Sequence, residues 1–155
     1  MIARSLLAGA AGASALDIYT YFDMLVRGRP ASSLPATVVQ KLAEKVGMMP
    51  LLADDESAEN RRQAAGALAG YGVGLGAAVA YGMLRPHTRW LPRAVAGLLL
   101  GGATLVGSEG TATALGATDW GTWTAGEWLS DILPRTLYGL TVAYVLERLM
   151  ADPLN

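Results

Sequence analysis

The sequence predicts an all-α membrane protein, in which a single domain forms an antiparallel four-helix transmembrane bundle. Three observations predict this fold class. Of the 155 residues, 52% are hydrophobic and 16% are charged, whereas a soluble domain carries about a quarter charged residues. The mean hydropathy is positive, at +0.33. The charges gather in a few short stretches with long apolar runs between them, as expected of a chain whose solvent is mostly lipid.

The first span is predicted over about residues 2–26. At about 1.5 Å per residue, this length crosses a hydrocarbon core about 30 Å thick. A basic stretch and Pro30, a helix breaker, end it. In the connector that follows, over residues 33–52, apolar residues recur at helical spacing among charged ones. This pattern predicts a short amphipathic helix that lies on the membrane surface or caps the bundle.

The other spans are predicted over about residues 64–84, 91–115 and 128–150. An acidic stretch at residues 54–59 precedes the second span, where carboxylates suit the positive end of a helix dipole. Short loops join the last three spans, so consecutive helices should be antiparallel neighbours.

Glycines recur at four-residue intervals within the second and third predicted spans. They are Gly66, Gly70 and Gly74 in the second span, and Gly97 and Gly101 in the third. In a bilayer, small residues at this spacing let two helix backbones approach closely. Packing between helices of one protomer is the favoured interpretation, and the alternative is a contact surface between identical subunits.

Ionisable residues within the predicted spans indicate a site, because such side chains are costly at membrane depth. On the predicted topology they all fall in one half of the bundle, towards the first and third loops. Asp131 and Arg135 are four residues apart with the acid first, the better order for an ion pair on a helix. We therefore predict a polar pocket that opens to this side. Its predicted lining residues are Asp17, Thr20, Asp23, Glu109, Asp131, Arg135 and Tyr138.

The alternative for these residues is a set of ion pairs that hold the helices together. Asp17 and Glu109 fit this alternative least well, because neither has a cation one turn away on its own helix.

Composition and motifs exclude several classes of function. The net charge is −1, and no basic stripe is interleaved with aromatic residues, so we expect no nucleic-acid partner. The chain has no cysteine and one histidine, His87, so we expect no disulfide, metal site or haem. It contains no phosphate-binding loop, nucleophile elbow or H-E-x-x-H motif. We therefore expect no catalytic residues, no cofactor and no enzymatic activity.

The distribution of basic residues predicts the location. The loop between the second and third spans is short and basic, whereas the next loop has no lysine or arginine. The positive-inside rule then places both termini in the cytoplasm of a multi-pass plasma-membrane protein.

Several short stretches carry a resemblance to known sequences. They are residues 20–24 (TYFDM) and 27–32 (RGRPAS), residues 59–62 (ENRR), and Trp128-Leu129-Ser130-Asp131 with Pro134 and Tyr138-Gly139. Together they resemble an uncharacterised family of small four-span proteins from actinobacteria. The resemblance implies a bacterial membrane protein and no particular activity. It also draws attention to Asp23, Arg27, Arg29 and Asp131 as a shared constellation.

Three functions are compatible with these patterns. The favoured one is a small scaffold or accessory protein, motivated by the glycine-rich helices, with the lipid bilayer, a second copy or another membrane protein as partner. The alternative is a transporter, channel or binding protein for protons, ions or a small polar solute, motivated by the one-sided carboxylate cluster. A membrane enzyme acting on a lipid ranks last, because it would need a catalytic motif as well as paired carboxylates.

Overall fold

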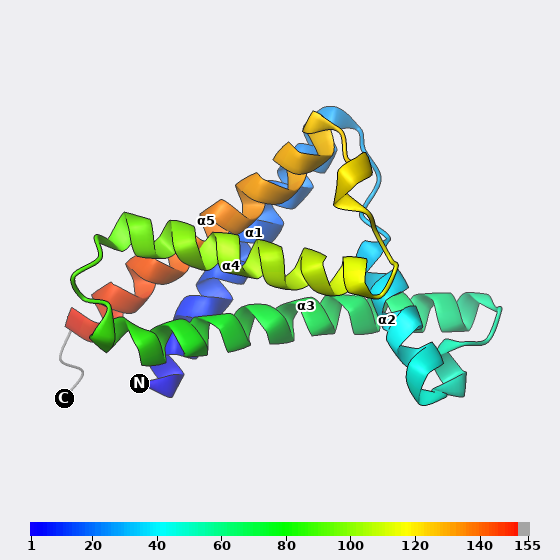
Figure 1. The fold of residues 1–155 in the computed structure, drawn as a ribbon, viewed down its shortest axis with the longest axis horizontal. Coiled ribbons are helices and arrows are strands. Elements are labelled where there is room, and N and C mark those ends of the chain that lie inside the picture. The colour runs from blue at the N-terminus through cyan, green and yellow to red at the C-terminus, as the bar shows by residue number, and fades with distance from the viewer. Residues whose placement is uncertain (152–155) are drawn as a thin grey trace.

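The computed structural model describes residues 1–151, which fold into helices joined by short loops (Figure 1). Three short 3-10 helices lie in the loops, and residues 1–151 contain no β-strand. The α-helices are α1 (Ile2–Arg27), α2 (Leu34–Val46), α3 (Glu56–Leu84), α4 (Arg93–Ala114) and α5 (Ala125–Ala151); the 3-10 helices are η1 (Met49–Leu51), η2 (Arg85–His87) and η3 (Trp120–Thr122).

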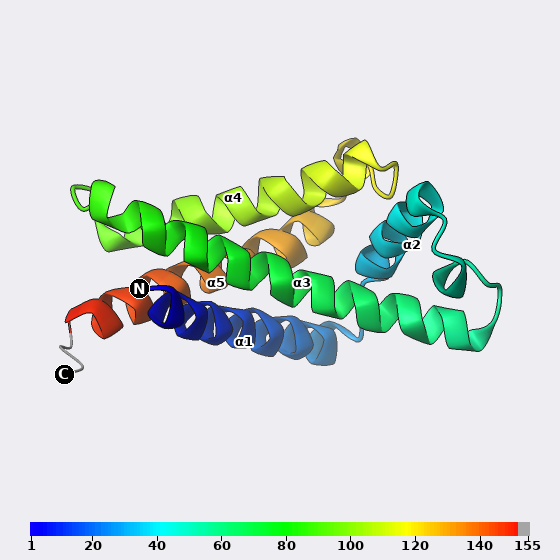
Figure 2. The same cartoon turned by 90° about the horizontal axis from the view of Figure 1, so that it is seen from below.

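The helices form two antiparallel pairs that cross each other obliquely (Figures 1 and 2). One pair is α1 with α5, which pack closely, and the other is α3 with α4, which run alongside each other with few direct contacts. The two pairs are joined by the packing of α5 on α4 and of α1 on α3. The short helix α2 lies across the first half of α3, beyond the crossing of the pairs.

Local signals in the sequence set the helix ends. Asp55 is the N-cap of α3, and its Oδ1 accepts a hydrogen bond from the backbone N–H of Ala58 at 2.6 Å. This cap starts α3 eight residues before the predicted second span. The prediction missed these residues because the first two turns of α3 are polar and add nothing to an apolar pattern. Gly28 and Gly47 end α1 and α2 with positive φ angles of 63° and 69°, a conformation that glycine adopts without strain.

The core lies where the two helix pairs cross. Four of its nine buried members are alanines, whose small side chains let the helices approach one another closely there. Its buried members are Ala8 of α1, Ala78 and Tyr81 of α3, Ala96 and Leu100 of α4, and Tyr138, Val142, Ala143 and Leu146 of α5.

Residues 1–151 are all-α, but the prediction of an antiparallel four-helix transmembrane bundle is wrong. Among the described residues, five α-helices form, and one segment, Glu56–His87, is long and apolar enough to cross a membrane. Charged residues such as Asp17, Glu109 and Asp131 interrupt the apolar runs of α1, α4 and α5. The sequence interpretation gave the apolar residues of those helices more weight than their charges.

The predicted location is corrected by the same finding. A multi-pass plasma-membrane protein with both termini in the cytoplasm requires several spanning helices, and a single candidate is found within residues 1–151. Many large apolar side chains of these helices are nevertheless exposed.

Candidate functional site

Three of the predicted site residues form one largely buried cluster between α4 and α5. Arg135 of α5 donates from Nη2 to Oε1 of Glu109 at 2.7 Å and to the hydroxyl of Ser108 at 2.9 Å, both on α4. From Nη1 the same guanidinium donates to Asp131, one turn earlier on α5. Glu109 is 3% exposed. Arg135 therefore joins two acids that are 22 residues apart in the sequence.

The cluster contains one more acid than base. Glu109 Oε2 and Asp131 Oδ2 are buried and have no hydrogen-bond partner within residues 1–151. Burial raises the pKa of Glu109, the charge of Asp131 raises it further, and Arg135 opposes both effects. Burial also raises the pKa of Asp131, again against Arg135. The cluster therefore holds a proton at a higher pH than an isolated carboxyl group would.

This cluster should make the folded protein less stable as the pH rises. Because the pKa values of both acids are raised in the folded state, the folded protein binds more protons than the unfolded chain above the ordinary carboxyl pKa of about 4. Urea unfolding of the Glu109→Gln variant between pH 4 and pH 7 should therefore show a smaller loss of stability with rising pH than the unsubstituted protein.

The control for this prediction is Asp23→Asn, which should change the pH profile in the opposite direction. The hydrogen bond from Arg29 lowers the pKa of Asp23, so its contribution to stability is lost as the pH falls. Parallel pH profiles for the unsubstituted protein and Glu109→Gln would contradict our account of the buried cluster.

Asp23 belongs to a second group, where the end of α1 meets the start of α5. Its carboxylate accepts from Arg29 Nε at 2.5 Å and from Arg27 Nη1 at 3.4 Å. Arg27 also donates to the hydroxyl of Ser130 on α5 at 2.6 Å. This group joins the two helices at their ends, and no hydrogen bond or ion pair in the described part of the chain joins it to Glu109.

Within residues 1–151, the remaining predicted pocket residues take no part in the hydrogen bonds or ion pairs of these two groups. Asp17 of α1 accepts a hydrogen bond from Tyr71 of α3 at 2.5 Å. The hydroxyl of Tyr138 donates to the backbone carbonyl of Gly74 at 2.5 Å, so it too joins two helices. Thr20 is half-buried on α1. The seven residues predicted to line one pocket are therefore distributed over several helix contacts.

The predicted glycines occupy two kinds of position. Gly97 and Gly101 of α4 pack against the backbone of α5. On α3, Gly66 packs against Pro35 of α2, and a Cβ at Gly74 would lie 3.6 Å from Tyr138. A Cβ at Gly70 would meet no other atom of the described residues within 4 Å.

Arg85 is a buried residue whose role the sequence did not indicate. It is 6% exposed at the end of α3, and its Nε donates to Glu147 of α5 at 2.9 Å. Its other nitrogens donate to the backbone carbonyls of Thr88 and Leu91 in the following loop. Because 62 residues separate Arg85 from Glu147, no spacing within one helix could have predicted this pair.

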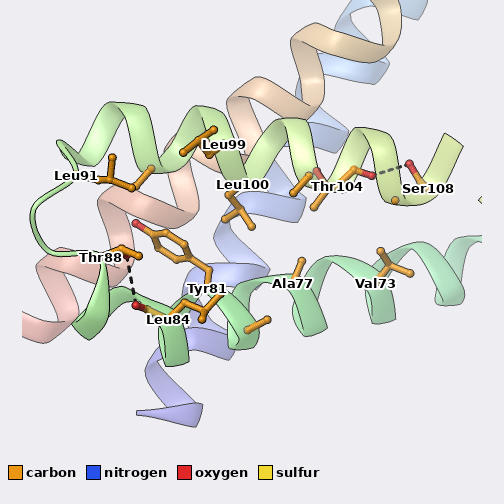
Figure 3. A pocket seen from close by; sticks show the side chains of 14 residues that line it. Val73, Ala77, Tyr81, Leu84, Thr88, Leu91, Leu99, Leu100, Thr104 and Ser108 are labelled. Atoms are coloured by element: carbon orange, nitrogen blue, oxygen red, sulfur yellow. Dashed lines mark hydrogen bonds between the residues drawn. The ribbon is translucent and has the colours of Figure 1, made fainter. Parts of the chain in front are cut away.

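An open groove with a volume of about 390 Å³ lies between α3 and α4 (Figure 3). The sequence did not predict it, because its small residues read equally well as packing positions. One wall is formed by Val73, Ala77, Ala80, Tyr81 and Leu84 of α3; the rest by Thr88 and Leu91 of the loop and by Ala96, Leu99, Leu100, Ala103, Thr104, Gly107 and Ser108 of α4.

Comparisons with family models, curated proteins and solved structures found no match to this chain. The resemblance to small actinobacterial four-span proteins therefore stays a prediction. Within residues 1–151, no group of three or more histidine, aspartate or glutamate side chains could hold a metal ion.

Proposed function

We propose that this protein is a small helical scaffold that acts by self-association, with the outer face of α3 packed against the same face of a second copy. The outer face is defined by Leu68, Gly72, Gly76 and Met83, which share one side of α3 at helical spacing. The observation that carries the proposal is the exposure of this apolar face. Leu68 is 72% exposed and Met83 is 63% exposed, and contiguous exposed apolar surface is typical of an interaction site.

The two glycines make close packing against another helix possible. An ideal Cβ at Gly72 or Gly76 would meet no atom of the described residues within 4 Å. No helix of residues 1–151 therefore occupies this side of α3. Glycines four residues apart let a partner backbone approach closely.

The order of residues along the outer face favours a second copy as the partner. Two large residues flank the two glycines, since Leu68 lies four residues before Gly72 and Met83 lies seven residues after Gly76. A two-fold dimer brings the same patch of both subunits together and requires such self-complementarity. In an antiparallel pair of α3 helices, the glycines meet at the centre and the large side chains pack at both ends.

The buried cluster supports a structural role for the charged residues. Glu109 and Asp131 both bind Arg135, and together they join α4 to α5. This arrangement favours the scaffold over the transporter or channel that the carboxylates alone suggested, because the acids serve contacts within the bundle.

Analytical ultracentrifugation over a range of concentrations tests self-association. We expect a dimer whose dissociation constant rises at least tenfold in Gly72→Leu and Gly76→Leu, because a side chain there holds the helices apart; tenfold corresponds to about 1.4 kcal/mol. Gly70→Leu is the matched control. It has equal free space on the same helix but lies on another side, so its dimer should be unchanged.

Disulfide trapping gives a second readout, because the chain has no cysteine of its own. Gly76→Cys, close to the centre of the outer face, should form a covalent dimer under mild oxidation, and Gly70→Cys should not. A monomer at every concentration would refute the proposal, as would equal effects of Gly70→Leu and Gly72→Leu. A complex with a different protein, or with lipid vesicles, formed through this face in place of the dimer would also refute it.

A further inference from the structure

The groove between α3 and α4 contains a polar group whose hydrogen-bonding capacity is unused. Tyr81 is 8% exposed, and its hydroxyl is buried without a hydrogen-bond partner among residues 1–151. Figure 3 shows its side chain projecting from α3 towards α4, with the hydroxyl near the loop that closes one end of the groove. Buried tyrosine hydroxyls are ordinarily hydrogen-bonded, so this one indicates a partner outside the chain.

The other polar groups of the groove are already paired. The Thr104 hydroxyl donates to the carbonyl of Gly101 at 2.8 Å, and Ser108 donates to that of Thr104 at 2.9 Å. The Thr88 hydroxyl donates to the carbonyl of Leu84. The remaining lining residues are apolar. A ligand that fits this groove is therefore apolar over most of its length, with one hydrogen-bonding group at the end near Tyr81.

The charges near Tyr81 favour an uncharged ligand. Arg85, the nearest cation in the sequence, is bound to Glu147 and to two backbone carbonyls, so its guanidinium is not free to pair with a carboxylate in the groove. Burying an unpaired charge is costly. From Tyr81 to Val73 the groove follows eight residues of α3, which is about 12 Å at about 1.5 Å per residue.

We propose that the groove between α3 and α4 binds a linear, uncharged amphiphile, whose hydrocarbon chain lies along the groove and whose terminal hydroxyl or carbonyl oxygen hydrogen-bonds to Tyr81. The groove lies on a different side of α3 from the outer face, so this site is independent of self-association.

Titration of the protein with 1-decanol and with decanoate at neutral pH tests the proposal, since the two ligands share a chain length and differ in charge. We expect 1-decanol to bind at least tenfold more tightly than decanoate. Tyr81→Phe should weaken 1-decanol binding about fivefold, the loss that corresponds to one hydrogen bond.

Thermal unfolding separates this role of Tyr81 from a purely structural one. Tyr81→Phe removes a buried hydroxyl that has no partner, so the melting temperature of the free variant should be unchanged or higher. The rise in melting temperature caused by 1-decanol should be smaller in Tyr81→Phe than in the unsubstituted protein, because the ligand binds less tightly.

A second pair of variants tests the groove itself. A Cβ at Gly107 or at Gly102 of α4 would meet no atom of the described residues within 4 Å, but only Gly107 lines the groove. Gly107→Leu should weaken 1-decanol binding at least tenfold, and Gly102→Leu should leave it unchanged.

Several outcomes would overturn the proposal. These are a failure of 1-decanol to bind, tighter binding of decanoate, full binding by Tyr81→Phe, and equal effects of Gly107→Leu and Gly102→Leu. If the protein forms a dimer and Gly107→Leu dissociates that dimer, the groove binds a second copy of the chain, and the proposal is overturned as well.

Discussion

Gly101→Ala should destabilise the folded protein by about 1–3 kcal/mol, the usual cost of overpacking a close contact. A Cβ at Gly101 would lie 2.6 Å from the carbonyl oxygen of Arg135 and 3.1 Å from its carbonyl carbon. Both atoms belong to the backbone of α5, so no side chain can rotate away to relieve the contact. The whole of α5 would have to move, and the buried hydrogen bonds of Arg135 would move with it.

Gly102→Ala is the matched control, one residue further along α4. A Cβ there would meet no atom of the described residues within 4 Å. Alanine is up to about 1 kcal/mol more favourable than glycine inside a helix, so this variant should be equally stable or more stable. Urea unfolding of both variants measures the difference. If the two substitutions had the same effect, the close contact between α4 and α5 would be refuted.

The helices and some of their contacts could be predicted from the sequence. The predicted ranges 91–115 and 128–150 correspond to α4 (Arg93–Ala114) and α5 (Ala125–Ala151), because apolar runs and turn residues are local signals. The pairing of Asp131 with Arg135 is local too, since both lie on one face of one helix. Glu109 joins this cluster because α4 lies beside α5. The spacing of residues within one helix does not indicate which helix lies beside it, so this contact could not be predicted.

The environment of the helices could not be predicted in this way. An apolar run has the same composition whether lipid, another helix or a partner covers it. The sequence analysis predicted that lipid surrounds all four long helices. Within the described residues, however, a single segment has the length and composition that a membrane span requires. The environment of a single side chain, that of Tyr81, could not be predicted from the sequence either. Its place in an apolar helix predicts burial, but the missing partner for its hydroxyl is evident only once α4 is in position beside it.

Arg135→Met should destabilise the folded protein by about 3 kcal/mol at pH 7, the low end of the range for breaking a buried ion pair. The low end applies because Asp131 is only partly buried, with 22% of its side chain exposed. The substitution keeps most of the apolar contacts of the side chain but leaves Glu109, which is 3% exposed, as a buried carboxylate without a cation. Removing the positive charge should therefore lower the free energy of unfolding by far more than the intact ion pair contributes to it.

The pH dependence of this loss identifies its cause. Without Arg135, the pKa of Glu109 and of Asp131 should rise further, since Arg135 lowers both in the unsubstituted protein. The loss caused by Arg135→Met should then shrink as the pH falls towards 4, where both acids bind protons and no buried negative charge remains. Urea unfolding at pH 4 and pH 7 measures this change, and a loss of equal size at both pH values would show that packing is its cause.

Two further variants separate charge from packing. In the triple variant Glu109→Gln, Asp131→Asn, Arg135→Met, no ionised group remains in the cluster, so most of the stability at pH 7 should return. Replacing a complete buried ion pair by neutral residues is often neutral, whereas removing one partner is not. Arg27→Met should cost much less than Arg135→Met, because Arg27 is 41% exposed in its pair with Asp23 and water screens that pair. If both arginines proved equally important, burial of the Arg135 cluster could not explain the effect.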